Sequence, residues 1–103
     1  MAKTDNRERN QMLYETILKL QSVEECRRVI EDLCTPHEMR AMEQRFDVAV
    51  YLQQGLVYLD ILDRTGASSA TISRVRRAML ENGAGGVMQQ IILREGLHEK
   101  MEE

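Results

Sequence analysis

The side chains best suited to chemistry lie in one short block, residues 64–80, with the sequence RTGASSATISRVRRAML. This block carries four basic and no acidic side chains, whereas residues 1–63 carry 8 basic and 12 acidic ones and residues 81–103 carry 2 and 5. Arginine pairs with phosphate oxygens and hydroxyl groups donate hydrogen bonds to them, so the block suits a nucleic-acid backbone. A solvated helix face is the simpler interpretation of four clustered charges, and the net charge of −3 indicates no broad basic surface.

The spacing around Gly66 favours nucleic-acid binding because it matches a helix-turn-helix. Glycine readily adopts a positive φ, which lets a short helix reverse into the next one. Four apolar residues fall at the positions that pack the two helices together: Ile61, Ala67, Ile72 and Val75. The outward positions carry hydroxyl and guanidinium groups: Ser68, Ser69, Thr71, Ser73, Arg74, Arg76 and Arg77.

We predict that these outward residues contact DNA. The hydroxyl groups would bond to phosphates or bases directly or through water, and Arg76 and Arg77 would mainly contact phosphates. Two positions fit the motif poorly, since Leu62 stands where a small residue usually permits close helix approach and Thr65 where an aliphatic residue usually packs.

Capping signals mark the helices that must position this block. Ser22 with Glu25 and Thr35 with Glu38 are capping boxes, in which a hydroxyl and a carboxylate each accept a bond from a free backbone N–H, and Pro36 suits a first helical position. Four residues should line the buried side of the helix after the first box: Val23, Cys26, Ile30 and Leu33. The six predicted helices cover residues 7–20, 23 to about 33, 36–54, about seven residues ending at 65, 68 or 69 to about 81, and 87 to about 95.

Composition predicts one all-α domain over residues 1–103, with the helix-turn-helix at about 57–81 and flexible ends at 1–6 and 97–103. The chain has one Pro, three Tyr, one Phe and no Trp, whereas all-β proteins accumulate turn prolines and aromatic strands. No apolar run approaches the roughly 18 to 20 residues that a bilayer crossing needs, and the N-terminus lacks a secretory signal, so we expect a cytoplasmic protein. Two cysteines are too few for a disulfide scaffold.

Two segments resemble the Trp repressor superfamily, most closely its YerC/YecD-type branch. They are LCTPHEMRAMEQR, residues 33–45, and GASSATISRVRRAM, residues 66–79, within a resemblance that covers roughly residues 10–95. It implies an intertwined homodimer in which the N-terminal helices of two chains interlock and each chain presents one helix-turn-helix. The Trp repressor is a standard example of such docking, with a recognition helix in the major groove, so a regulator of this type, most often a repressor, would bind a palindromic operator.

The same resemblance implies a small-molecule effector pocket at Thr35, Arg45 and Arg74. In the tryptophan-binding member, the arginine equivalent to Arg74 is followed by a glycine that leaves room for the indole, but this chain has Val75. We therefore predict that L-tryptophan is not its effector. The segment LVYLD, residues 56–60, is one residue shorter than in that repressor and lacks its base-reading basic residue, so the operator sequence does not carry over.

Other interpretations of individual residues are less specific. Cys26 and Cys34 have no zinc-site spacing, so we expect no metal or cofactor. No nucleophile or glycine-rich loop accompanies the carboxylates of Asp60 and Asp63, and we expect no enzyme. Arg45 could bind an anion or form a buried ion pair with a neighbouring carboxylate. The alternative for the whole chain is a helical adaptor that uses its acidic surface to bind a protein partner and does not bind DNA.

Overall fold

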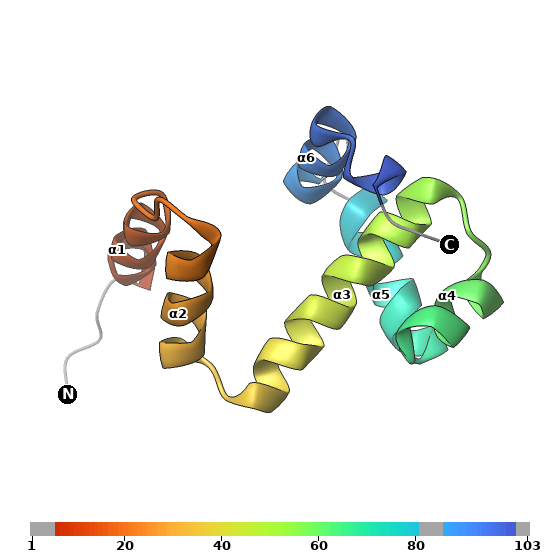
Figure 1. Ribbon diagram of the computed structural model, residues 1–103, viewed down its shortest axis with the longest axis horizontal. Coiled ribbons are helices and arrows are strands. Elements are labelled where there is room, and N and C mark those ends of the chain that lie inside the picture. Colours follow the sequence, from red (N-terminus) through yellow and green to blue (C-terminus); the bar gives the residue numbers. More distant parts are fainter. Residues whose placement is uncertain (1–5, 81–85, 101–103) are drawn as a thin grey trace. The chain divides into compact units, whose positions relative to one another are not determined.

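The computed structural model of the protein describes residues 6–80 and 86–100, with side chains from residue 11 onwards. The described residues form six α-helices and one short 3-10 helix, and none of them lies in a strand, which confirms the predicted all-α class. The elements are α1 (Asn6–Ile17), α2 (Val23–Leu33), α3 (Pro36–Gln54), α4 (Tyr58–Thr65), α5 (Ser69–Leu80), α6 (Val87–Glu95) and η1 (Leu97–Glu99) (Figure 1). Within this part of the chain, no helix combines the length and the apolar character needed to span a membrane.

The chain divides into two compact units, Met1–Met39 and Arg40–Glu103. The first unit contains α1, α2 and the first turn of α3, and the second contains the rest of α3 and all later helices. The organisation of residues 1–103 as a single domain stays a prediction.

Both predicted capping boxes are present in the first unit. Before α2, the Ser22 hydroxyl accepts from the Glu25 N–H at 3.0 Å, and the Glu25 carboxylate accepts from the Gln21 N–H at 2.8 Å. Before α3, the Thr35 hydroxyl accepts from the Glu38 N–H at 3.1 Å, and the Glu38 carboxylate accepts from the Thr35 N–H at 2.8 Å. This bond from the Thr35 backbone is the main cause that holds the pKa of Glu38 below its ordinary value. Local capping therefore sets where both helices begin.

α1 differs from its predicted range at both ends. Asn6, predicted to lie in the flexible arm, is the first residue of α1, and residues 1–5 lie outside the described residues. The helix ends at Ile17, three residues before the predicted end at Leu20. The Leu20 N–H donates to the Ile17 carbonyl at 3.1 Å, a tighter turn than the i to i−4 bond of an α-helix closes.

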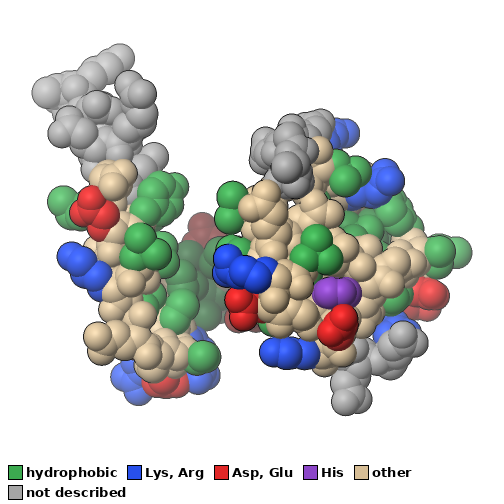
Figure 2. Space-filling view, turned by 90° about the horizontal axis from the view of Figure 1, so that it is seen from above, with side chains coloured by type: hydrophobic (Ala, Val, Ile, Leu, Met, Phe, Trp, Pro, Cys, Tyr) green, Lys and Arg blue, Asp and Glu red, His purple; other side chains and the backbone are tan. Residues whose placement is uncertain are grey.

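The apolar stripes of the first unit are not buried within one chain. The prediction that four residues line a buried side of α2 is wrong for the single chain: Val23 is 83% exposed, Leu33 is 59% exposed, Cys26 is exposed and Ile30 is half-buried. On α1, Met12 is 71% exposed. Figure 2 accordingly shows hydrophobic side chains on the surface of α1 and α2. No described residue of α2 is buried, so the unit leaves much of its apolar surface to solvent.

The second unit has a core to which α3, α4, α5, α6 and the turn between α4 and α5 all contribute. Its described buried hydrophobic residues are Val48, Ala49, Val50, Ile61, Ala67, Ile72, Val75, Met79 and Ile92. All four residues predicted to pack the helix-turn-helix are among them, each at most 5% exposed, so this prediction is confirmed. Burial of apolar area is the dominant stabilising term in folding, and here it fixes α4 and α5 against the C-terminal half of α3 (Figure 1).

The prediction that residues 97–103 form a flexible tail is wrong for the first of these residues. Leu97–Glu99 form η1, and the leucine packs against the core. The Gln54 side-chain amide donates to the His98 carbonyl at 2.7 Å and ties this turn to the end of α3. Residues 101–103 lie outside the described residues.

Candidate nucleic-acid interface

The turn between α4 and α5 has the geometry expected of a helix-turn-helix. Gly66 ends α4 in the left-handed region, with φ 73° and ψ 5°, and its N–H donates to the Leu62 carbonyl at 2.8 Å. Three residues later α5 begins. Leu62 stands where the motif usually has a small residue, and its larger side chain is accommodated because it remains 37% exposed.

The hydrogen bonds of Thr65 explain how a polar residue can stand at a position of this turn where an aliphatic residue usually packs. Its hydroxyl donates to the Ile61 carbonyl at 2.7 Å and accepts from the Ala67 N–H at 3.1 Å. The Thr65 carbonyl accepts from the Gln44 side-chain amide of α3 at 3.0 Å. Hydrogen bonds to these half-buried polar groups replace the apolar contacts of the usual residue.

The first turn of α5 is capped by Ser68, which changes the predicted position of one residue. The Ser68 hydroxyl accepts from the Thr71 N–H at 3.1 Å, and it donates to the Thr71 hydroxyl oxygen at 3.1 Å. Ser68 and Ser69 are exposed, as predicted, whereas Thr71 is half-buried. The fully outward placement of Thr71 is therefore wrong, because its side chain is part of the cap, and its contact with DNA stays a prediction.

α5 has two chemically distinct faces. Ile72, Val75 and Met79 are each at most 5% exposed and belong to the core. The exposed residues include five of the predicted DNA contacts: Ser69, Ser73, Arg74, Arg76 and Arg77. One face is thus fixed by packing, and the opposite face presents hydroxyl and guanidinium groups on a rigid helix.

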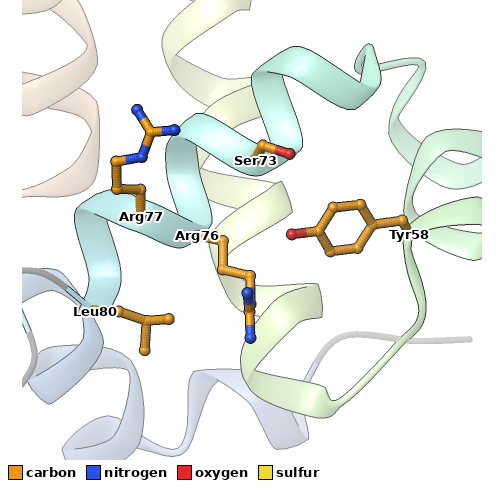
Figure 3. Close-up of a pocket in the computed structure, with 5 residues that line it drawn as sticks. All are labelled: Tyr58, Ser73, Arg76, Arg77 and Leu80. Atoms are coloured by element: carbon orange, nitrogen blue, oxygen red, sulfur yellow. The ribbon is translucent and has the colours of Figure 1, made fainter.

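A surface hollow of about 330 Å³ opens beside this exposed face (Figure 3). It is lined by Ser73, Arg76, Arg77 and Leu80 of α5 and by Tyr58, the first residue of α4. The hydroxyl groups of Tyr58 and Ser73 face the same space, whereas the two guanidinium groups extend in different directions. Among the residues that the structure describes, no acidic side chain lines this hollow.

Sequence reasoning missed Tyr58 and Leu80 as members of this surface. A signal for Leu80 was available, because residues 73, 76, 77 and 80 are spaced at i, i+3, i+4 and i+7 and share one helix face. No comparable signal identifies Tyr58, since its position depends on how α4 packs beside α5.

The arginines of the basic block differ in their surroundings. The guanidinium carbon of Arg64 lies 5.6 Å from the centre of the Tyr51 ring, a cation–π distance. Arg74 and Arg76 form no ion pair with any carboxylate in the described parts of the chain. Their charges are therefore not neutralised by those groups, and an anion could bind them.

The residues of the predicted effector pocket are not brought together by any described contact. Thr35 belongs to the unit Met1–Met39, where its hydroxyl caps α3, whereas Arg45 and Arg74 are exposed residues of the other unit. Val75 is 5% exposed and part of the core. The pocket stays a prediction.

Arg45 is not half of a buried ion pair. Its side chain is exposed, and none of the described ion pairs includes it. The pKa of nearby Asp47 is raised above its ordinary value by desolvation, and the charge of Glu43 one turn earlier raises it further. An exposed arginine without a described partner fits the anion-binding alternative better than the ion pair.

No described group of three His, Cys, Asp or Glu residues could hold a metal ion. Cys26 and Cys34 are both free thiols, the first exposed and the second half-buried.

Comparison with known proteins places this geometry in a family. The sequence model described as Trp repressor protein matches residues 8–95. Over 67 residues the chain is 48% identical to the uncharacterized protein YerC of Bacillus subtilis strain 168, an alignment covering 65% of this chain and 64% of that protein, less than two thirds of the relative's length.

Two solved structures are similar over most of the chain. One is the crystal structure of a TrpR-like protein from Eubacterium eligens ATCC 27750, with 34% identity, a TM-score of 0.82, and coverage of 96% of this chain and 100% of that one. The other is a candidate Trp repressor from Staphylococcus aureus, with 36% identity, a TM-score of 0.79, and coverage of 86% and 87%. On the match over residues 8–95, the chain belongs to the Trp repressor family.

Proposed function

We propose that this protein is a sequence-specific DNA-binding transcriptional regulator that acts as a homodimer and represses promoters by occupying a palindromic operator. Membership of the Trp repressor family supports a regulator rather than an enzyme. A regulator of bacterial promoters works in the cytoplasm, where we propose that this protein acts.

The observation that carries this proposal is the division of α5 into a core face and a cationic face. Ile72, Val75 and Met79 anchor the helix in the core, so its exposed residues are held in fixed positions relative to one another. The block of residues 64–80 carries no carboxylate that would repel phosphate. A rigid helix that presents hydroxyl and guanidinium groups is suited to the major groove, where these groups reach base edges and flanking phosphates.

The exposed apolar residues of the first unit support the homodimer. Met12 at 71%, Leu18 at 86% and Val23 at 83% exposure are costly to leave in water, since burying one such side chain fully stabilises a protein by about 1.5–3 kcal/mol. A second copy with the same stripes would cover them, and a two-fold dimer would present two recognition helices to a two-fold operator.

We further propose that L-tryptophan is not the effector. Val75 occupies the position where the tryptophan-binding member of the family has glycine, and here its side chain is 5% exposed among core residues. A β-branched side chain at that position fills space that an indole ring would need. Thr35, Arg45 and Arg74 could still hold a different small anion.

The salt dependence of DNA binding tests the proposal. Footprinting of the tagged protein on genomic DNA would supply an operator, and anisotropy titrations would give the affinity at several salt concentrations. Arg76→Ala and Arg77→Ala should each lower affinity for all sequences and reduce the salt slope by about 0.9 for each phosphate that is no longer neutralised, or about 1.8 per dimer. Arg94→Ala is the matched control, because this exposed arginine lies on α6 and pairs with Glu95 at 3.0 Å.

The outcomes separate the two classes of function. Unchanged slopes for both α5 variants would show that the assignment of these arginines to phosphates is wrong. A wild-type protein that passes through heparin without retention and leaves duplex DNA unbound would instead support the helical adaptor that binds a protein partner.

A further inference from the structure

We propose that Tyr58, Ser73 and Arg76 form a seat for one backbone phosphate of the bound DNA, and that Tyr58 is the residue that positions α5 on the duplex. This inference rests on the proposed function, and it adds a contact from the first helix of the motif. It starts from the hollow of about 330 Å³ that these residues line together with Arg77 and Leu80 (Figure 3).

The chemistry of the hollow selects an anion. The residues that line it carry two hydroxyl groups and two guanidinium groups, and none of the described lining residues carries a carboxylate. All four groups donate hydrogen bonds, and the guanidinium groups have no lone pair to offer in return. The apolar part of the lining, the Leu80 side chain and the Tyr58 ring, suits the deoxyribose that adjoins a phosphate rather than the polar edge of a base.

Side chains from two helices line the hollow, and the packing of the core fixes the position of these helices relative to each other. Ser73, Arg76 and Leu80 lie on one side of α5, and the other side of that helix is buried in the core through Ile72 and its neighbours. Tyr58 comes from α4, and its hydroxyl points toward α5 (Figure 3). A tyrosine has only two side-chain torsions, so it can present a hydroxyl at a fixed place with little loss of conformational entropy.

The place of the hollow along α5 favours the DNA backbone over the bases. In a helix-turn-helix, the N-terminal residues of the second helix contact base edges and the first helix crosses the backbone. The hollow lies along Ser73 to Leu80, the C-terminal two thirds of α5, and it includes the first residue of α4. A phosphate held between the two helices would therefore fix how far α5 enters the groove.

Tyr58→Phe tests this assignment, because it removes only the hydroxyl and keeps the ring that packs beside α5. We expect the affinity of the dimer to fall by about tenfold, since one hydrogen bond is removed per protomer. The loss should be equal for operator and unrelated DNA, and the salt slope should not change, because a neutral hydroxyl displaces no counterion. Tyr51→Phe is the matched control: Tyr51 is half-buried on α3 and does not line the hollow.

Operators with a single neutral methylphosphonate identify the phosphate. The substitution is moved along each half-site, one phosphate at a time. It should lower the DNA affinity of the wild-type protein when it replaces the phosphate bound in the seat. The affinity of Tyr58→Phe should fall less at that phosphate alone, as a double-mutant cycle requires. Equal sensitivity of both proteins at every position would overturn the inference, and so would wild-type affinity of Tyr58→Phe. A changed sequence preference in place of a uniform loss would show that the hollow reads a base.

A free phosphate is distinguished from the DNA backbone by competition. Inorganic phosphate should weaken DNA binding no more than chloride does at equal ionic strength, and stronger competition by phosphate would overturn assignment of the seat to the duplex. Failure of the wild-type protein to bind any DNA would refute the proposed function itself. Normal wild-type binding with an unaffected Tyr58→Phe variant would refute this inference alone.

Discussion

Replacement of Gly66 by alanine should destabilise the protein without weakening the proposed contact with DNA. Gly66 has φ 73°, and a left-handed conformation costs an alanine roughly 1–2 kcal/mol. A Cβ atom built there would meet only the Gln44 side-chain nitrogen, at 3.9 Å, which is an ordinary contact. The cost of Gly66→Ala is therefore one of backbone conformation and not of steric overlap.

The expected magnitude follows from two opposing terms. Alanine restricts the unfolded chain and so stabilises the folded protein by about 0.4–1 kcal/mol, which offsets part of the conformational cost. We expect a net loss of about 1 kcal/mol per chain in the free energy of unfolding, or a midpoint lower by about 4–8 °C. Unfolding should be measured at fixed protein concentration, because the midpoint of the proposed dimer would depend on concentration.

Two further variants separate conformation from other effects. Gly66→Asn should lose less than Gly66→Ala, because asparagine tolerates the left-handed region. Gly55→Ala, at φ 93° with nothing within 4 Å of its Cβ, should also be destabilised although it lies outside the motif. A Gly66→Ala protein as stable as the wild type would refute the reasoning. Abolished DNA binding in a folded Gly66→Ala protein would show instead that the duplex approaches this backbone closely.

Three other outcomes can be tested with standard measurements. Ile72→Ala, at a residue with 0% exposure, should lower the free energy of unfolding in urea by about 2–5 kcal/mol, whereas the exposed Ser73→Ala should leave it nearly unchanged. Above the ordinary pKa of 4.5, Glu38→Gln should have a lower unfolding midpoint than the wild type. The difference between the two midpoints should close as pH falls through the lowered pKa of Glu38, because protonation removes the charge that the cap stabilises. A difference that persists in acid would contradict this. Calorimetric titration with L-tryptophan should give no saturable heat, and a saturable signal would refute the argument from Val75.

Features set by neighbouring residues were predictable from the sequence. The caps at Ser22 and Thr35 depend on a partner three residues away, and the turn at Gly66 depends on the conformational freedom of one residue. The four packing positions of the helix-turn-helix followed from the same local spacing. The starts of α2 and α3 and the buried face of α5 were therefore predicted correctly.

Features set by contacts between distant residues were not predictable in the same way. Leu97 belongs to a largely polar C-terminal segment in sequence, but it packs on a core supplied by residues near 50, 61 and 72. Thr71 is on the outward side of the helix by spacing, yet its hydroxyl bonds to the Ser68 cap. The place of Tyr58 beside α5 depends on how two helices pack, which periodicity within either helix does not describe.

The hydrogen bond from the Gln44 side-chain amide to the Thr65 carbonyl links α3 to the turn between α4 and α5. Gln44 immediately precedes Arg45, the candidate anion-binding residue of α3. This bond joins α3 to the turn in addition to the packing of the core, so a movement of α3 at Gln44 would either carry the Thr65 carbonyl with it or break the bond.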